Sequence, residues 1–461
     1  MTLPPPSPSG ALPATRFPDR FLWGAATSAY QIEGSPLADG AGASIWHRFA
    51  HMPGTIQGGD TGDIACDHYR RAADDVALMR NLGLTGYRLS IAWGRILPTG
   101  RGRANRPGLA FYERLVDALL ASNIQPMITL YHWDLPAALD DLGGWLNPDS
   151  AGWFAEYTDV VVRALDDRVR LWVTINEPWV ITDGGYMRGV LAPGHESAAE
   201  AGRVSYNLLR AHAAAVDAYR ASGRHEIGLA VNLEPQMPAS ADAADLDAAD
   251  RAGAYFNRQY LDPVFLGISP LSLRAVYGDG PPGMREADMA LVRRPMDFLG
   301  INYYSRSVVR GDPGALPSGA ARVPQTQSAH TDMGWEIYPA GLTAILRWVR
   351  ERYGPVPMYV TENGAAFPEP ASSDGTPLQD HERVAYLRSH IQAAHAAMVA
   401  GVDLRGYFAW SLLDNFEWNY GYAKRFGIVH VDRDTQRRTP KASAVFFREV
   451  IRTNGANLLP G

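Results

Sequence analysis

Eight short apolar runs recur along the chain, and turn-forming residues bound each of them. Most of these runs are apolar throughout rather than alternating with polar residues, which is typical of strands that are covered on both faces. We therefore interpret them as buried strands. They are the segments 21–27, 87–93, 125–133, 169–176, 227–233, 297–303, 358–361 and 405–411.

The segments between these runs have the apolar spacing of amphipathic helices. Examples are residues 67–83 and 109–123, which end at Gly and Asn respectively, both common helix stops. Strand and helix repeated eight times predict an α/β fold, a single (β/α)8 TIM barrel with extended βα loops. A doubly wound open sheet is the alternative, but no G-x-G-x-x-G motif follows the first run.

No long linker divides the chain into separate units. Residues 1–16 are rich in proline and are expected to form a disordered lead-in, and residues 17–455 are predicted to form one barrel domain. The segment 310–332 is polar and rich in Gly and Pro, which predicts a long loop. Residues 234–250 are expected to form a shorter loop that leads into an Ala-rich helix.

Composition excludes several classes of partner. The chain has 461 residues and a formal net charge of -6, and it lacks the concentrated basic patch of nucleic-acid binders. The sequence has no run of about 18 uninterrupted apolar residues, the length that would indicate a membrane span. Cys66 is the only cysteine and no signal peptide is visible, so we expect a cytoplasmic protein without disulfides. The oligomeric state stays open.

Polar and aromatic side chains gather where the predicted strands end. In (β/α)8 barrels this edge carries the active site. A polar residue at one strand end is often only a cap, but seven such endings predict a shared pocket. The residues concerned are Gln31, Arg88, His132, Trp133, Asn176, Glu177, Asn302, Tyr304, Glu362, Trp410, Glu417 and Trp418.

Glu177 and Glu362 are the candidate catalytic pair. Each follows an apolar run and precedes a structure breaker, Pro178 in one case and Asn363-Gly364 in the other. Two carboxyl groups that face one cavity are what cleavage of a glycosidic bond requires: one protonates the leaving oxygen and the other attacks the anomeric carbon. The alternative for either residue alone is a loop cap or a partner for an arginine.

Nine sequence motifs together resemble the family 1 glycoside hydrolases. The resemblance extends over residues 17–441, and the motifs occur in the family's order: FLWGAATSAYQIEG, YRLSIAWGRILPTG, YHWDLP, TINEPW, LAPG, FLGINYYS, DMGWEIYP, YVTENG and WSLLDNFEWNYGYAKRFGIVHVD. This resemblance implies a (β/α)8 barrel without cofactor that hydrolyses terminal, non-reducing β-linked sugars with retention. It also implies that Glu177 is the general acid/base and that Glu362 is the nucleophile.

These roles require Glu362 to be ionised and Glu177 to be protonated. A neighbouring cation lowers the pKa of a carboxyl group, and Arg88 is the candidate beside Glu362. Tyr304 is expected to donate a hydrogen bond to the same carboxylate. Once Glu362 bonds to the sugar, Glu177 loses a negative neighbour, so its pKa should fall and suit it to act as a base.

The resemblance also assigns residues to the sugar. Trp410 is expected to lie against the apolar face of the ring, and Trp335 to lie on the aglycone side, with a packing role as its alternative. Asn302, Trp133 and Phe426 are placed as supporting residues. The residues expected to bind hydroxyl groups are Gln31, His132, Asn176, Glu417 and Trp418.

The expected substrate is a neutral β-glucoside such as a short cello-oligosaccharide or an aryl glucoside, with β-galactosides and β-fucosides tolerated. Glu417 would repel a 6-phosphate, and Phe426 stands where relatives acting on phosphorylated sugars have tyrosine. His132 has no ligand partner at a spacing such as H-E-x-x-H, so no metal is predicted. Two alternatives are a catalytically silent sugar-binding barrel and an enzyme in which transglycosylation dominates.

Overall fold

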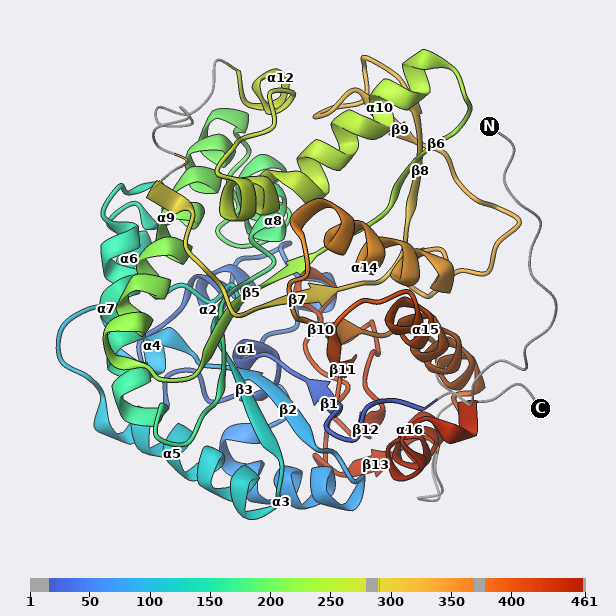
Figure 1. The fold of residues 1–461 in the computed structure, drawn as a ribbon. Helices are drawn as coiled ribbons and strands as arrows, with labels where there is room; N and C mark the ends of the chain where they lie inside the picture. The colour runs from blue at the N-terminus through green and yellow to red at the C-terminus, as the bar shows by residue number, and fades with distance from the viewer. Residues whose placement is uncertain (1–15, 279–288, 290, 369–377, 459–461) are drawn as a thin grey trace.

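Eight parallel strands close into a barrel at the centre of the computed structural model (Figure 1). The structure describes residues 16–278, 289, 291–368 and 378–458. Around the barrel the strand order is β1-β11-β10-β7-β5-β4-β3-β2. The barrel strands are β1 (Leu22–Ala26), β2 (Gly86–Ser90), β3 (Gln125–Tyr131), β4 (Leu171–Asn176), β5 (Glu226–Asn232), β7 (Phe298–Asn302), β10 (Met358–Asn363) and β11 (Leu404–Trp410).

The predicted (β/α)8 barrel is confirmed, since each predicted strand overlaps one of these eight. Strand boundaries differ from the predicted ones by up to three residues, and two cases are instructive. The second run ends at Ser90 rather than at residue 93, because Trp93 begins the short helix α4 (Trp93–Ile96) and donates a hydrogen bond to the Gly100 carbonyl. The strand β10 extends two residues past Thr361, so Glu362 itself pairs with Asn302 of β7. The predicted lead-in lies almost entirely outside the described residues.

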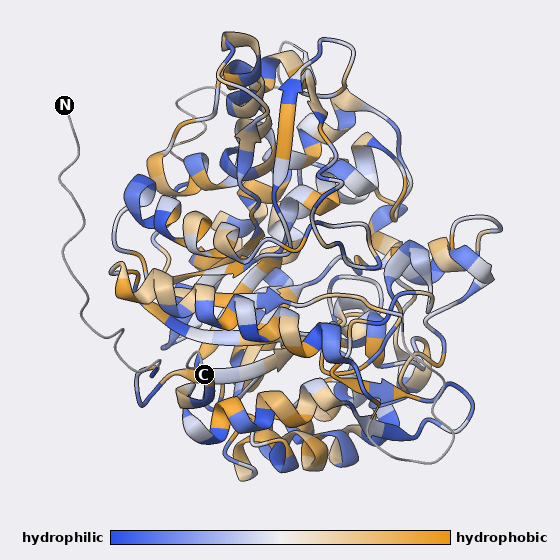
Figure 2. Ribbon diagram, turned by 90° about the vertical axis from the view of Figure 1, so that its right-hand side faces the viewer, coloured by the Kyte–Doolittle hydropathy of each residue, from blue (hydrophilic) through white to orange (hydrophobic). Residues whose placement is uncertain are grey.

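Long amphipathic helices surround the barrel. Figure 2 shows hydrophobic and hydrophilic residues interleaved along them. No helix in the described segments has the length and hydrophobicity needed to cross a membrane. The long helices are α3 (His68–Asn81), α5 (Arg106–Ala121), α7 (Ser150–Leu165), α9 (Ala198–Ser222), α14 (Pro339–Tyr353), α15 (His381–Val399) and α16 (Ala442–Thr453).

Shorter elements occupy the loops. They are α1 (Ala29–Ile32), α2 (Ile45–Ala50), α6 (Ala137–Asp140), α8 (Pro178–Val180), α11 (Gln259–Leu261), α12 (Leu273–Tyr277), β12 (Val429–Val431) and β13 (Arg438–Pro440).

A small sheet forms where the sequence suggested loops. The strands β6 (Gln236–Pro238), β8 (Ser307–Gly311) and β9 (Ala320–Arg322) pair with one another, and α10 (Ala243–Gly253) packs on them (Figure 1, upper right). The prediction of one long loop over 310–332 is therefore wrong at β9 and at the last two residues of β8. This segment is held by the antiparallel pairing of β8 with β9. Arg251 also donates hydrogen bonds to the carbonyls of Ser318 and Gly319.

Apolar side chains fill the interior of the barrel. They form a cluster separate from the larger core, to which the buried side chains of the helices belong. At one end this cluster continues into Trp410 and Phe426, so packed side chains support the site described below. The barrel-strand members are Ala26, Met127, Leu171, Val173, Ala230, Phe298, Tyr359 and Phe408.

Gly364, which directly follows β10, provides a test of this packing. A Cβ atom there would overlap the carbonyl oxygen of Trp410, so Gly364→Ala must push the ends of β10 and β11 apart. We expect it to lower the free energy of unfolding by about 1–3 kcal/mol, the usual cost of overpacking. Denaturant unfolding measures this change.

The matched control is Gly152→Ala on the exposed face of α7, where a Cβ atom meets no other atom within 4 Å. Alanine loses less chain entropy than glycine on entering a helix, so this variant should gain about 0.5–1 kcal/mol. Equal effects of the two substitutions would contradict the packing argument.

Candidate active site

A cavity of about 970 Å³ opens at the C-terminal ends of the barrel strands. Most of the predicted site residues line it. Gln31, Arg88 and Asn176 are not in its wall but lie fully buried behind it. The predicted residues in the wall are His132, Trp133, Glu177, Asn302, Tyr304, Trp335, Glu362, Trp410, Glu417, Trp418 and Phe426.

Both oxygens of the Glu362 carboxylate are held by other side chains. Arg88 Nη1 donates to Oε1 at 2.5 Å, and the Tyr304 hydroxyl donates to Oε2 at 2.7 Å. Burial raises the pKa of Glu362 above its usual range, and the Arg88 charge and the Tyr304 hydrogen bond oppose this rise. Burial and the charge of Glu362 raise the pKa of Tyr304, so its hydroxyl keeps the proton that it donates. These contacts favour the ionised form of Glu362.

Glu177 lies in a different environment. Its Oε1 accepts a hydrogen bond of 2.7 Å from Asn302 Nδ2, a neutral donor. Burial and the nearby charge of Glu362 raise the pKa of Glu177 to about 8, and Arg88 and Asn302 only partly oppose this. With Glu362 ionised, Glu177 therefore holds a proton near neutral pH. The two members of this pair thus differ in the protonation state that their surroundings favour.

Hydrogen bonding defines the orientation of Asn176 and the tautomer of His132. Asn176 Oδ1 accepts from Arg88 Nη2 at 2.6 Å and from Asn302 Nδ2 at 3.0 Å, so its amide nitrogen faces His132 Nε2 at 3.1 Å. Because an amide NH2 only donates, Nε2 accepts and the proton of the neutral ring is on Nδ1. Burial and the charge of Arg88 lower the pKa of His132 well below its usual range.

His132 Nδ1 is a donor that the site leaves for a ligand. It is buried and has no hydrogen-bond partner among the described residues, and the ring lines the cavity. A buried donor without a partner costs about 1–3 kcal/mol. A ligand hydroxyl in the cavity would remove that cost.

Glu417 is a further buried carboxyl group in the cavity wall. Burial and the charge of Glu362 raise its pKa to about 8. Gln31 holds the backbone of Phe416, the residue before Glu417, because its Nε2 donates to the Phe416 carbonyl at 2.9 Å. Ser28 fixes the Gln31 amide in turn by donating to its Oε1 at 2.6 Å. A protonated Glu417 offers both a donor and an acceptor, which suits a pair of neighbouring hydroxyl groups.

Aromatic rings form two groups in the cavity wall. The His132 ring lies nearly parallel to Trp410, with 5.9 Å between centroids and 14° between planes, and Trp418 is in contact with Trp133 at 4.6 Å. In the second group Trp335 packs against Tyr304 at 5.2 Å, so Trp335 both packs and lines the cavity. Such faces bind the apolar surfaces of ring-shaped ligands.

Three wall residues have left-handed backbone conformations. Trp133, Glu177 and Trp418 have φ values of 78°, 46° and 51°, which cost about 1–3 kcal/mol each outside glycine. Neighbouring bonds hold them: the Glu177 amide donates to the Ala230 carbonyl at 2.8 Å, and the Trp133 indole donates to the Asn176 carbonyl at 2.9 Å. The sharp turn at Glu177 directs its carboxyl group away from the line of β4.

Sequence reasoning missed several supporting residues. Thr361 donates to Asn302 Oδ1 at 2.7 Å, and Thr129 accepts from Arg88 Nε at 3.2 Å. Trp179, which the sequence left unassigned, lines the cavity with its indole nitrogen unpaired among the described residues. A polar residue inside an apolar strand next to Glu362 was the available signal for Thr361. The contacts of Thr129 and Trp179 depend on the tertiary fold.

The raised pKa of Glu177 has a measurable effect on stability. A carboxyl group with a raised folded-state pKa contributes most stability below its ordinary pKa and loses it as the pH rises towards about 8. Glu177→Gln removes this loss. We expect the variant to have a higher melting temperature than the parent at pH 8 and a smaller difference at pH 5.

Glu336→Gln is the matched control, since the hydrogen bond from Arg306 holds the pKa of Glu336 below its usual range. A lowered pKa contributes stability above the ordinary pKa, so this variant should melt below the parent at pH 8. The same sign for both variants would contradict the assigned environments.

Comparisons with known proteins match the chain over most of its length. Residues 14–456 match the model of glycosyl hydrolase family 1. "Beta-glucosidase A" of Thermotoga maritima is 48% identical over 95% of this chain and 98% of its own. The "1,4-beta-D-glucan glucohydrolase" of Thermotoga neapolitana is 47% identical over 95% and 99%.

A solved structure agrees with this match. The beta-glucosidase from Thermotoga maritima in complex with glucoimidazole is 47% identical, covers 96% of this chain and 100% of its own, and superposes with a TM-score of 0.93. With the closed barrel, the paired carboxyl groups and these matches, the chain belongs to glycosyl hydrolase family 1.

Proposed function

We propose that this chain is a retaining β-glucosidase that releases terminal, non-reducing β-D-glucosyl residues. The observation that carries the proposal is the pair of buried carboxyl groups in one cavity, one bonded to Arg88 and Tyr304 and the other to the neutral amide of Asn302. The names of the relatives and the bound glucoimidazole of the Thermotoga maritima structure support glucose as the recognised sugar.

The first step joins the sugar to Glu362. A carboxylate oxygen of Glu362 attacks the anomeric carbon, the bond between that carbon and the glycosidic oxygen breaks, and Glu177 gives its proton to the departing oxygen. The Tyr304 hydroxyl and Arg88 hold the attacking group in place. The products of this step are a free alcohol or sugar, a glycosyl ester of Glu362 and an ionised Glu177.

The second step releases the sugar. Glu362 has lost its charge in the ester, so the largest electrostatic cause of the raised pKa of Glu177 is gone. Glu177 then takes a proton from a water molecule as the water oxygen attacks the anomeric carbon and the ester bond breaks. Two inversions at that carbon leave its configuration unchanged.

Three groups in the wall are suited to bind the sugar. The unpartnered His132 Nδ1–H and the carboxyl group of Glu417 in the wall are proposed to bind hydroxyl groups, and the Trp410 ring to support the apolar face. Gln31 and Asn176 lie behind the wall, and their contact with the sugar stays a prediction. Trp335, which packs on Tyr304, is proposed for the aglycone side.

The proposed substrates are neutral β-glucosides, including short cello-oligosaccharides and aryl glucosides. The name of the glucan glucohydrolase relative supports the former. Tolerance of β-galactosides and β-fucosides stays a prediction, as does a cytoplasmic location. Glu417 stands in the cavity wall as an acidic side chain, which disfavours a phosphorylated sugar because a phosphate group is bound by cationic donors rather than by a carboxyl group.

Removal of the proposed nucleophile tests the reaction. The parent should release nitrophenol from an aryl β-glucoside, and Glu362→Ala should abolish this turnover because no group remains to form the ester. Added azide is small enough to enter the space left by the side chain and should then give the α-glucosyl azide, identified by NMR. A β-azide from this variant would reverse the two roles, and no turnover by the pure parent would refute the proposal.

Removal of the proposed acid should depend on the leaving group. Glu177→Ala should lose about 10²–10⁴-fold in kcat/KM on cellobiose, the usual contribution of general acid catalysis. The loss in the first step should be much smaller with dinitrophenyl β-glucoside, whose phenolate leaves without a proton. With azide this variant should give the β-glucosyl azide, the opposite anomer. Equal losses on both substrates would exclude Glu177 as the acid.

A further inference from the structure

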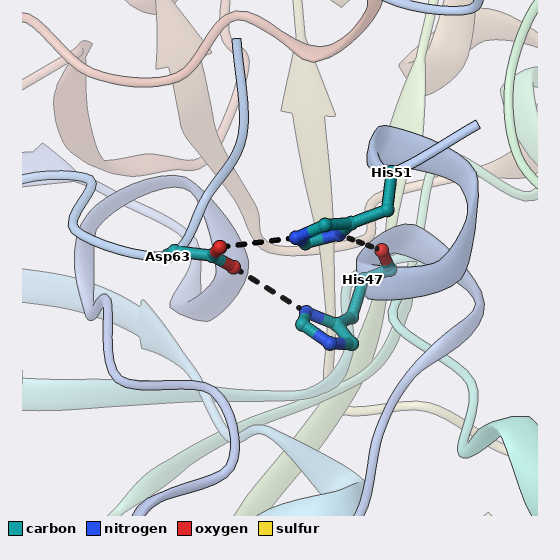
Figure 3. A group of neighbouring side chains, drawn as sticks. All are labelled: His47, His51 and Asp63. Carbon is teal, nitrogen blue, oxygen red and sulfur yellow. Dashed lines mark hydrogen bonds and ion pairs between the residues drawn. The ribbon is translucent and has the colours of Figure 1, made fainter. Parts of the chain in front are cut away.

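Two histidines and an aspartate converge on the protein surface outside the cavity. His47 lies in α2 and His51 at its C-terminal end, four residues apart and therefore on one face of the helix. Asp63 lies in the segment that follows the short helix η2 (Gln57–Gly59). Figure 3 shows that both rings point toward the Asp63 carboxylate. None of the three residues lines the cavity.

The donor atoms are close enough to share one ion. One ligand atom from each residue lies within 4.8 Å of the other two. His51 Nε2 lies 3.0 Å from Asp63 Oδ2, and His47 Nδ1 lies 3.4 Å from Asp63 Oδ1. Ligands at about 2.0–2.1 Å around a tetrahedral zinc ion lie about 3.3 Å from each other.

Two of these atoms have no hydrogen bond of their own. His47 Nδ1 and Asp63 Oδ1 are both shielded from solvent and have no hydrogen-bond partner among the described residues. Buried polar atoms without partners are rare in folded proteins and often mark an ion or a water molecule. They face each other at 3.4 Å as an ion pair without a hydrogen bond, and one cation between them would coordinate both.

The second histidine is held in the orientation of a metal ligand. His51 Nδ1 lies 2.6 Å from the His47 carbonyl oxygen, which can only accept, so Nδ1 carries a proton and donates. Nε2 lies 3.0 Å from Asp63 Oδ2, to which it donates when the ring carries two protons. Displacement of that proton by an entering cation would leave a lone pair on Nε2 that is directed at the ion. A backbone carbonyl that holds the far nitrogen of an imidazole is the usual outer contact of metal-bound histidine.

We propose that His47 Nδ1, His51 Nε2 and the Asp63 carboxylate bind one divalent transition-metal ion of the zinc type. Two imidazoles and one carboxylate suit zinc better than magnesium or calcium, which prefer sets of oxygen ligands. Three protein ligands leave a fourth position for water.

The ion would connect two segments that support the cavity wall. Trp46 of α2 is in contact with Trp418 at 4.3 Å, and Gly62, next to Asp63, lies against the Tyr30 ring, which is stacked on Trp418. Binding would therefore hold α2 and the segment 60–63 together behind Trp418. Its expected effect is on the stability of the fold, and it is independent of the hydrolytic reaction.

The test is calorimetric titration of the full chain, without a polyhistidine tag, with zinc chloride. One zinc ion per chain should bind, and His47→Asn, His51→Asn and Asp63→Asn should each weaken binding at least about tenfold, the smaller loss seen when even an outer contact of a ligand is removed. The matched control is His195→Asn, which removes a similarly exposed histidine paired with Glu200 at 2.7 Å. It should leave the zinc affinity unchanged.

Cobalt absorption and the melting temperature give two further measurements of metal binding by the parent and the variants. Cobalt chloride should give the visible absorption of a four-coordinate ion with the parent, and this absorption should be absent in the three variants. Zinc should raise the melting temperature of the parent and of His195→Asn, because a ligand that binds only the folded state stabilises it. Absence of zinc binding would leave a plain histidine–aspartate ion pair and overturn the proposal. Wild-type affinity in the three cluster variants would also overturn it.

Discussion

The ion pair between Arg88 and Glu362 is the interaction on which the site depends. The guanidinium group is fully buried and bonds to side chains of three other barrel strands: Thr129 of β3, Asn176 of β4 and Glu362 of β10. A buried charge costs several kcal/mol unless it is paired and hydrogen-bonded, and the planar fork of arginine meets several partners at once. The barrel must therefore close in one register for Arg88 to be satisfied.

The same ion pair makes two chemically identical side chains behave differently. Glu362 has a cation and a hydroxyl donor, whereas Glu177 has a neutral amide donor and a negative neighbour. Burial in a common cavity amplifies this difference, because charges interact more strongly where water is excluded. The proton on Glu177 is thus a consequence of the charge on Glu362. When that charge disappears in the glycosyl ester, the proton is no longer held, which links the two steps of the proposed reaction.

Sequence reasoning succeeded where local pattern and tertiary environment agree. Strands buried on both faces are apolar throughout, so all eight were located, and Pro178 signalled the turn at Glu177. It failed where distant contacts decide. The strand β9 was predicted as loop because its segment is polar and rich in Gly and Pro, and because the contact that holds it, Arg251, lies 67 residues away from Ser318 in the chain. The spacing of His47 and His51 is visible in the sequence, but Asp63 joins them only through the fold.

The sequence by itself determined the strand–helix alternation, the barrel and the positions of both glutamates at strand ends. The spacing of apolar residues and the Pro and Gly residues that end strands and helices are local properties of the chain. Only the tertiary structure decided which groups surround each carboxyl group. Arg88 and Glu362 are 274 residues apart in the chain, and Asn302 reaches Glu177 from 125 residues away. The pKa of a buried group depends on its burial and on charges within a few ångströms. Neither can be inferred from the order of residues along the chain. The closed barrel sets both by bringing the ends of all eight strands to one rim.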